Sequence, residues 1–514
     1  MITFDNTFAR TLDGFFLDWP PAPASAPALV FFNAELANDL GLKLDACDRD
    51  QLTALFSGQR LPDTARPIAQ VYAGHQFGGF SPRLGDGRAL LLGEVVSPAG
   101  QRFDIAFKGS GRTPYSRGGD GKAALGPMLR EVLVSEGLHA LGIPTTRSLA
   151  VVTTGDDVFR DHALPGAILT RVASSHLRVG TFQYFAARGE QERVRQLFDY
   201  ALARHDPKLA GQPNSARAWF EAVARRQSQL ISQWMNVGFI HGVMNTDNMT
   251  ISGETIDYGP CAFMEAYDPR ACFSSIDHQG RYAYANQPGI ARWNLARLAE
   301  AVLPLLHEDT DQALVLATEV LDQFPQWVEE ALLEGQRAKL GLALTGSANG
   351  TVAAAHRATD KTLVEAWLAL LQHHQVDYTL AWRYLSNLCD PAIRSNSALH
   401  ALFSDPLALD AWLERWRERC AEDDLALQHD PATRADDRSR AMNRVNPVII
   451  PRNHQVEAAL AAASDHADFG PFERLLSALQ TPFGNGDHQA ISARPFAEPA
   501  PAAFTDNYRT FCGT

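Results

Sequence analysis

Two short polar motifs near the middle of the chain restrict its fold and chemistry more than any other feature. The first runs from His241 to Asn248, with the sequence HGVMNTDN, and the second is Asp257-Tyr258-Gly259. Asn248 and Asp257 are nine residues apart and flank a hairpin-like segment, TISGETI. Mg²⁺ takes oxygen ligands and usually only one or two from protein, so this pair predicts a magnesium site. Asn, Asp and Gly also favour turns, and each motif alone would indicate only a turn.

The spacing of the two motifs matches the catalytic loop of protein kinases, H-R-D-L-x-x-x-N followed by D-F-G, without a gap. His241 aligns with the loop histidine, and Asn248 and Asp257 align with the two metal ligands. Val243 stands where kinases carry the catalytic aspartate. Because valine has no carboxylate, the pattern predicts a bound metal–nucleotide without the usual group that takes the proton of the acceptor hydroxyl.

A lysine and a helix upstream fit the same pattern. Lys108 ends the sequence IAFK in an expected strand, like the phosphate-binding lysine of VAIK in kinases, although a lysine at a strand end is more often a solvated edge charge. In kinases a glutamate of the neighbouring helix holds this lysine, and the helix expected here carries Glu131 and Glu136. At about 100° per residue these side chains point about 140° apart, so only one can face Lys108. Spacing alone does not choose between them.

Glycine-rich and basic segments suited to phosphate lie in the same half of the chain. Gly85-Asp86-Gly87-Arg88 precedes an expected strand and would let the backbone approach a phosphate, although GDG is also a common tight turn. A second glycine-rich segment, SRGGDG, spans 116–121. Arginine suits two-point phosphate contacts, and any single arginine can instead pair with a nearby acid. The arginines that gather here, in a chain of net charge −13, are Arg83, Arg88, Arg112, Arg117, Arg171 and Arg178.

The order of the expected elements predicts an α+β, protein-kinase-like bilobal fold. Strands are expected at 89–96, 103–108, 148–153 and 167–172, with a helix at 126–141 and later helical runs at 194–203, 216–237, 290–306, 363–373 and 407–420. We therefore expect a small mixed α/β N-lobe with an N-terminal extension at 1–175, which binds the nucleotide phosphates. Residues 176–514 would form a large, mainly helical C-lobe that holds the catalytic and metal loop and a C-terminal tail.

Composition argues against several classes of protein. The content of 46% hydrophobic and 20% charged residues is that of an ordinary globular protein, and the net charge of −13 argues against a nucleic-acid or acidic-membrane partner. The N-terminus has no basic segment leading into an apolar run, and no stretch reaches the roughly 18 apolar residues that span a bilayer. The six cysteines show no C-x-x-C pairing, which argues against a structural zinc site. We expect a cytoplasmic monomer with reduced thiols.

Together with their flanks, these segments resemble the selenoprotein O family, the kinase-like protein AMP transferases, over nearly the whole chain. The resemblance is carried by 72–78 (YAGHQFG), 84–88, 107–111 (FKGSG), 241–248, 257–259, 277–282 (DHQGRY) and 444–447 (RVNP). It implies that ATP binds in the orientation opposite to that in kinases, and that AMP moves to Ser, Thr or Tyr hydroxyls of protein substrates. The last two segments have no chemical meaning that the sequence alone reveals.

The resemblance also implies roles for individual residues. Lys108 would pair with Glu131, Asp247 would act as the base, and Asn248 and Asp257 would ligate Mg²⁺, with Mn²⁺ as the alternative. The residues that it implies for nucleotide binding are Gly85, Gly87 and Arg88 in the loop, Lys108, Arg171 and Arg178 at the phosphates, and Asp120 and Gly121 at the adenine end. A plain cysteine near the end of the chain, Cys512, also makes a regulatory disulfide with Cys272 conceivable.

Three other functions stay open from the sequence. An ordinary phosphotransferase with Asp247 as base is the first, and the valine at position 243 counts against it. Transfer of UMP from UTP is the second, because nothing in the sequence selects the nucleobase. A catalytically dead ATP-binding scaffold is the third, and the joint presence of Lys108, Asn248 and Asp257 argues against it. The protein targets are not encoded in any pattern that we recognise.

Overall fold

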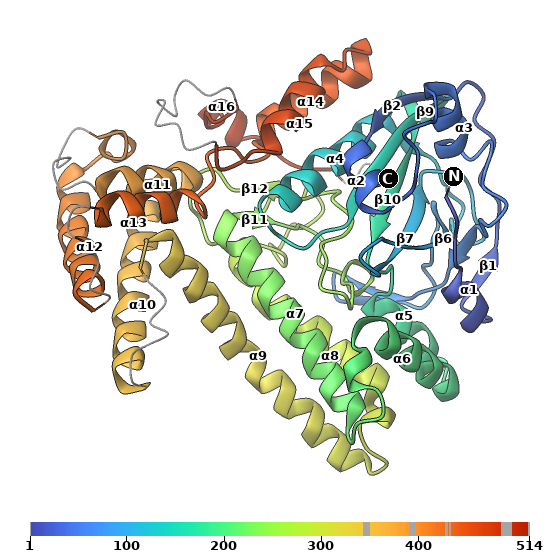
Figure 1. Cartoon of the computed structure of the whole chain (residues 1–514), viewed down its shortest axis with the longest axis horizontal. Helices are drawn as coiled ribbons and strands as arrows, with labels where there is room; N and C mark the ends of the chain where they lie inside the picture. Colours follow the sequence, from blue (N-terminus) through green and yellow to red (C-terminus); the bar gives the residue numbers. More distant parts are fainter. Residues whose placement is uncertain are drawn as a thin grey trace.

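The chain folds into an antiparallel sheet followed by a long succession of helices (Figure 1). The structure is a computed structural model that describes residues 2–342, 350–389, 397–426, 430, 433–484 and 496–511. Sheet and helices are largely segregated along the sequence, and the fold is therefore of the α+β class, as predicted. None of the helices in these described ranges combines the length and apolar character needed to cross a membrane.

The main sheet is built between residues 16 and 173, and its pairings are antiparallel. Its strand order is β1-β3-β6-β7-β10-β9-β2, with β8 paired to β10. The strands are β1 (Phe16–Asp18), β2 (Ala28–Phe32), β3 (Ile68–Gln70), β6 (Ala89–Val96), β7 (Arg102–Lys108), β8 (Ala123–Ala124), β9 (Arg147–Phe159) and β10 (Ala163–Ala173), and the smaller pairs are β4 (Gly74–Gln76) with β5 (Gly79–Ser81) and β11 (Phe239–Ile240) with β12 (Ala262–Phe263). The four predicted strands are present. β9 and β10 extend beyond their predicted ends because their more exposed residues continue to pair with each other.

The six predicted helices are also present, inside α4, α6, α7, α8, α10 and α12. The helices are α1 (Thr7–Thr11), α2 (Ala34–Asp39), α3 (Arg49–Phe56), α4 (Leu125–Ala140), α5 (Val179–Ala186), α6 (Gln191–His205), α7 (Ser215–Val237), α8 (Gln287–Leu306), α9 (Thr310–Lys339), α10 (Gly350–His373), α11 (Tyr378–Leu385), α12 (Pro406–Ala426), α13 (Arg434–Asn443), α14 (Asn453–His466), α15 (Gly470–Leu479) and α16 (Ala502–Thr505). The two polar motifs and the segment between them, residues 241–259, form a loop between α7 and α8 that we call the polar loop. It contains one short 3-10 turn, Thr246–Asn248.

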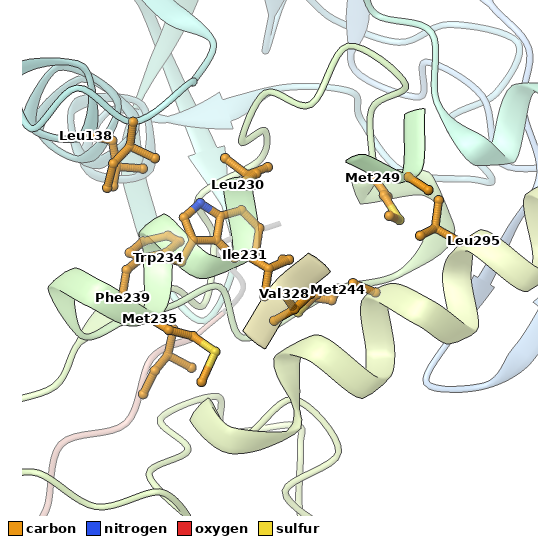
Figure 2. Packing of buried hydrophobic residues seen from close by; sticks show 14 of the residues in the cluster. Leu138, Leu230, Ile231, Trp234, Met235, Phe239, Met244, Met249, Leu295 and Val328 are labelled. Atoms are coloured by element: carbon orange, nitrogen blue, oxygen red, sulfur yellow. The ribbon is translucent and has the colours of Figure 1, made fainter. Parts of the chain in front are cut away.

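The polar loop is anchored in the largest hydrophobic core, which α7 shares with α8 and α9. Figure 2 shows Met244 and Met249 of the loop among side chains of these helices. The indole N–H of Trp234 in α7 donates to Thr255 Oγ1 (2.9 Å), and the Trp234 ring lies 5.3 Å from the buried ring of His241. Apolar side chains of this core thus hold one side of the loop, where His241 is also buried. The polar residues Asn245, Asp247 and Asn248 line the cavity.

A second core joins α4 to helices from the far end of the sequence. Met128 and Val132 of α4 belong to the same buried cluster as Val456 of α14. Arg130 of α4 also forms an ion pair with Glu457 of α14 (2.9 Å), across 327 residues of sequence. Figure 1 accordingly shows α14 and α15 next to α4. The C-terminal helices therefore return to the sheet and cover one face of α4 along much of its length.

Candidate active site

One cavity of about 920 Å³ brings together the residues to which the sequence analysis assigned nucleotide, metal and catalytic roles. The sheet region contributes the loop before β6 and the end of β7, α4 contributes its first turns, and the polar loop lies opposite. The selected residues in its wall are Gly85, Gly87, Arg88, Lys108, Asp120, Gly121, Glu131, Arg171, Arg178, Asp247, Asn248 and Asp257. Their shared location is a finding, whereas the individual roles stay predictions.

Asp257 lies at the centre of a cationic group. Its Oδ1 is 2.6 Å from Lys108 Nζ and 2.8 Å from Arg171 Nη1, and its Oδ2 is 3.5 Å from Arg178 Nη1. Burial opposes ionisation, but the charges of these three neighbours hold the pKa of Asp257 well below its ordinary value. The backbone of Asp257 has a φ of 63°, a left-handed conformation that is uncommon outside glycine and often marks a functional position.

The structure also separates the two glutamates of α4. Lys108 Nζ donates to Glu131, and both side chains are buried. Glu136 instead accepts from Arg147 Nε (2.9 Å) and from the backbone N–H of Ser148 (3.1 Å), at the far side of the helix. Glu131 is therefore the residue that shares the cavity with Lys108. Asp86 and Asp247 also lie close to Arg178, so the charges at Asp257 are partly offset. Over the whole described lining of the cavity, nine Lys and Arg side chains face six carboxylates, which is a surplus of positive charge.

Asn248 and Asp257 present a donor set that suits a hard divalent cation. The Asn248 amide donates through Nδ2 to the carbonyl of Val243 (3.0 Å), which leaves its Oδ1 as the oxygen available to a cation. An amide oxygen and a carboxylate are ligands that Mg²⁺ accepts, with phosphate and water completing its shell. Among the described residues no group of three or more His, Cys, Asp or Glu side chains is placed to hold a metal. Asn248 and Asp257 do not form such a group, because they are only two residues and one of them is an asparagine.

Asp247 is a buried carboxylate in the wall of the cavity. Its Oδ2 accepts from Gln76 Nε2 (3.2 Å), and its buried Oδ1 has no hydrogen-bond partner within the described residues. Burial raises the pKa of Asp247 to about 6, although the charge of Arg178 opposes this shift. Val243, where kinases have their catalytic aspartate, contributes only an apolar side chain to the same wall.

Packing against Tyr115 requires glycine at two positions of the loop before β6. A side chain at Gly85, which has a φ of 78°, would place a Cβ 2.5 Å from the ring of Tyr115. A Cβ at Gly87 would lie 2.9 Å from the carbonyl oxygen of Tyr115. At the other end of the cavity Asp120 is exposed and pairs with Arg160 (2.9 Å), which lowers the pKa of Asp120. At the glycine loop, by contrast, Gly85 and Gly87 let the backbone approach Tyr115 closely.

The six arginines of the basic segment divide into two groups. Arg88, Arg117, Arg171 and Arg178 line the cavity. Arg83 and Arg112 are outside its described lining: Arg83 lies over the Tyr115 ring (5.5 Å) and Arg112 donates to the carbonyls of Gly118 and Gly119. The prediction of a phosphate-binding arginine group therefore holds as a matter of position for four of the six.

Comparison with known sequences assigns the family. Residues 1–480 match the family described as "Protein adenylyltransferase SelO". The chain belongs to this family. It is 56% identical to a protein nucleotidyltransferase YdiU of Cereibacter sphaeroides over 513 residues, which cover 99% of each chain. The corresponding proteins of Chromobacterium violaceum and Rhizobium rhizogenes are 55% identical over 496 residues (96% of this chain and 98% of the relative) and 51% identical over 513 residues (100% and 97%). The protein is therefore an enzyme that transfers a nucleotide.

Several residues of this SelO-family cavity were not selected from the sequence. The ring of Tyr72 lies 4.5 Å from the Arg178 guanidinium, and Gln76 contacts Asp247. Both belong to YAGHQFG, which carried the resemblance but no chemistry that we had derived. The other unselected contributors include Leu460, Ala461 and Ser464 of α14 and Thr510 and Phe511. No local pattern marks these residues, because only the return of the C-terminal segments to α4 brings them to the cavity.

The segments 277–282 and 444–447, which had no evident chemical meaning in the sequence, hold other parts of the structure in place. The carboxylate of Asp277 accepts from the backbone N–H of Tyr282 (2.8 Å), and the Tyr282 hydroxyl donates to Asn245 Oδ1 in the polar loop (2.6 Å). Asn446 donates to the carbonyl of Lys339 at the end of α9 (2.9 Å), which ties together helices remote from the cavity. The first segment therefore holds the loop, and the second holds the helical core.

The predicted disulfide is not testable from the described part of the chain. Cys272 is a free, half-buried thiol, and burial raises its pKa to about 11. Cys512 lies outside the described residues. The last described segment does approach Cys272, since the Ser275 N–H donates to the Thr510 carbonyl (2.9 Å). The disulfide stays a prediction.

Proposed function

We propose that this enzyme transfers AMP from ATP to Ser, Thr or Tyr hydroxyls of other proteins, with Mg²⁺, and that it binds ATP in the orientation opposite to that of kinases. The observation that carries the proposal is the balance of charge in the cavity. Its described lining holds nine Lys and Arg side chains and six carboxylates, with Lys108, Arg171 and Arg178 gathered at Asp257, while position 243 offers no carboxylate. This arrangement favours a triphosphate held by its charged oxygens.

The chemistry requires little beyond alignment and charge. The acceptor oxygen forms a bond to the α-phosphorus, the bond from that phosphorus to the bridging oxygen breaks, and pyrophosphate leaves with the bonding electrons. Arg171 and Arg178 would stabilise the charge that develops on the phosphate oxygens. The carboxylate of Asp247, which lies in the cavity wall, would accept the proton of the hydroxyl. General-base assistance of this kind contributes about 10²- to 10⁴-fold.

The divalent metal would be held by Asn248 Oδ1 and by the carboxylate of Asp257. When bound, the metal supplies positive charge to the phosphates and fixes their orientation. Asp257 would then be shared between the metal and its cationic neighbours. Mn²⁺ has similar ligand preferences, and the same two residues would serve it.

The larger organisation is also part of the proposal. We infer a kinase-like arrangement of two lobes, 1–175 and 176–514, with the nucleotide between them. In support, the cavity is lined on one side by the sheet region and α4 and on the other by the polar loop. We further propose that the enzyme acts as a cytoplasmic monomer on protein substrates.

The test is to follow separate labels on the α- and γ-phosphates of ATP. The enzyme is incubated with Mg²⁺ and either labelled ATP, with itself and dephosphorylated casein as hydroxyl-bearing acceptors. We expect label in protein from the α position only, removable by phosphodiesterase as AMP. Label from the γ position alone would instead identify a phosphotransferase.

The remaining alternatives give distinct results in the same assay. Label from α-labelled UTP at a higher kcat/KM than from ATP would make UMP the transferred group. ATP binding without any transfer would support the scaffold. The Asp247→Asn variant is the matched control. If the enzyme is a transferase, this variant should lose transfer rate and keep its affinity for ATP.

A further inference from the structure

The β4–β5 hairpin packs directly against the loop that carries Asp247. A side chain at Gly74 would place its Cβ 2.5 Å from Asp247 Oδ1, so only glycine permits this approach. The backbone N–H of His75 donates to Thr246 Oγ1 (2.7 Å), and that of Phe77 donates to Asn245 Oδ1 (3.2 Å). The hairpin is therefore fastened to the residues on the N-terminal side of the carboxylate.

The turn of this hairpin holds a strained residue next to the site. Phe77 and Gly78 are its central residues, between paired Gln76 and Gly79, and their φ values are 51° and 87°. A two-residue turn with both φ values positive normally uses Asn-Gly or Gly-Gly, and a bulky residue there costs free energy. The Tyr282 hydroxyl is 3.1 Å from the Phe77 N–H, and the two rings lie 5.1 Å apart. The surroundings thus enforce a conformation that the sequence of the turn disfavours.

The residue that this conformation places at the cavity is Gln76. Its Nε2 lies 3.2 Å from Asp247 Oδ2. Within the described residues, no other side chain hydrogen-bonds this carboxylate, and Oδ1 has no partner. The guanidinium of Arg178 reaches the backbone carbonyl of Asp247 (2.9 Å) rather than its carboxylate. A carboxylate that lacked the amide contact could rotate about its last torsion, which has a broad energy minimum.

We infer that Gln76 is a positioning residue for the transfer reaction. Its amide donates to Oδ2 of Asp247 while Oδ1 lies enclosed against Gly74, so that the carboxylate is held with the second lone pair of Oδ2 directed toward the acceptor hydroxyl. An uncharged amide suits this task because it donates a hydrogen bond without neutralising the carboxylate. The inference rests on the proposed role of Asp247 and extends it, since it names the group that orients the base.

Gln76 can be changed without removing the bonds that hold the hairpin. The hairpin keeps its contacts to Thr246 and Asn245, which involve backbone N–H groups of its neighbours. Gln183 also holds His75 (2.9 Å), independently of Gln76. A loss of activity in a Gln76 variant would therefore not simply reflect loss of the fold.

The test compares Gln76→Met, which keeps the length of the side chain but loses the donor, with Gln76→Glu, which places a second carboxylate beside Asp247. With α-labelled ATP and casein, we expect kcat to fall about tenfold or more for Gln76→Met and further for Gln76→Glu. The Kd for Mg·ATP and the thermal midpoint should stay near those of the wild type. Gln196→Met, which alters a glutamine bonded to the carbonyl of Thr11, is the matched control and should leave kcat unchanged.

A double-variant cycle decides whether Gln76 acts through Asp247. If it does, adding Gln76→Met to Asp247→Asn causes no further loss of kcat, because the group to be positioned is already gone. An equal loss in both backgrounds would overturn the inference. If Asp247→Asn is too slow to measure, the order of the single variants decides: equal rates for Met and Glu would overturn it. Failure of the proposed function is recognised separately, by a wild-type enzyme that transfers no α label.

Discussion

Two buried charge clusters in this molecule have similar components and opposite balances. The cavity cluster consists of Lys108, Glu131, Arg171, Arg178 and Asp257, with more cations than carboxylates. The Arg452 cluster consists of Arg452 with Glu265 and Asp377, where one fully buried guanidinium faces two carboxylates. The first lines the large cavity, whereas the second does not contribute to that lining within the described residues.

The difference teaches how buried charge is used. The Arg452 guanidinium is matched within the protein, since its second nitrogen also reaches the carbonyl of Ala497 (3.3 Å). The cations of the cavity cluster are only partly offset by the nearby carboxylates of Asp86 and Asp247, and the described lining of the cavity keeps more cations than carboxylates. A buried charge without compensation is costly, and an anionic ligand that supplies the missing charge is therefore favoured. We expect the first cluster to serve binding and transfer and the second to serve stability.

The strongest test removes the centre of the cavity cluster. Asp257→Ala should reduce AMP transfer about 10³-fold or more, because both the proposed metal ligand and the partner of three cations are lost. The measurement is incorporation of α label at saturating Mg·ATP. Asp322→Ala, which removes an exposed partner of Arg292, is the control and should have wild-type activity. A transfer rate for Asp257→Ala within tenfold of the wild type would contradict the assigned site.

The reciprocal test removes the cation of the Arg452 cluster. Arg452→Met leaves two buried carboxylates without their cationic partner, so we expect the free energy of unfolding to fall by about 3–5 kcal/mol. Urea denaturation measures this change, and an Mg·ATP titration of the folded protein should give an unaltered Kd. Arg66→Met breaks an exposed pair with Asp18 and should cost about 1 kcal/mol or less. A parallel loss of ATP affinity in Arg452→Met would remove the distinction between the clusters.

The stability of the protein should depend on pH through His176, which contacts Arg171 of the cavity cluster. His176 is buried, accepts from Arg171 Nε (3.3 Å) and lies 3.0 Å from Asp104. Burial lowers the pKa of His176 to about 4. Since the unfolded chain binds this proton near pH 6.5, His176 contributes stability above that pH and loses it as the pH falls toward about 4.

The expected loss is up to about 3 kcal/mol across that interval. Urea midpoints measured from pH 7 to pH 4 provide the test, and His176→Gln should show a shallower fall than the wild type. Identical slopes for the two proteins would mean that His176 does not stay neutral behind Arg171.

The smallest effect concerns a single arginine of the cavity cluster. Arg171→Gln removes one of the charged contacts that we propose for the phosphates, and we expect about tenfold weaker binding of Mg·ATP at low salt. Calorimetric titration measures the affinity. Arg83→Gln is the matched control because Arg83 lies over Tyr115, outside the described cavity lining. Equal losses for both variants would indicate a general field of positive charge rather than a specific contact.

The sequence predicted the α+β class and the elements that carry the site, because these depend on local patterns. The strand that ends at Lys108 and the loop from His241 to Asn248 are each recognisable within a few residues. The choice between Glu131 and Glu136 required the structure, since both positions on α4 are buried. The 30-residue helix α9 was not among the predicted helices. Pro325 in its middle removes a backbone donor and locally resembles a helix end.

The remaining misses come from long-range contacts. α14 lines the cavity only because it returns to α4, and its alanine-rich sequence contains no sign of this position. Gln76 reaches Asp247 across 171 residues of sequence, and a lone glutamine has no pattern that indicates such a partner. The six chosen arginines show the converse: a concentration of charge in the sequence includes residues, such as Arg112, that bond their own loop.

The contact between α4 and α14 has a consequence for the order in which the enzyme matures. Arg130 and Glu457 meet across 327 residues, and contacts so far apart in sequence form slowly because a very long loop must close. During synthesis the earlier segments emerge and fold first. We therefore expect Lys108 and Glu131 to be in place well before the α14 wall arrives. A newly made molecule would acquire the α14 wall of its cavity as one of its last folding steps.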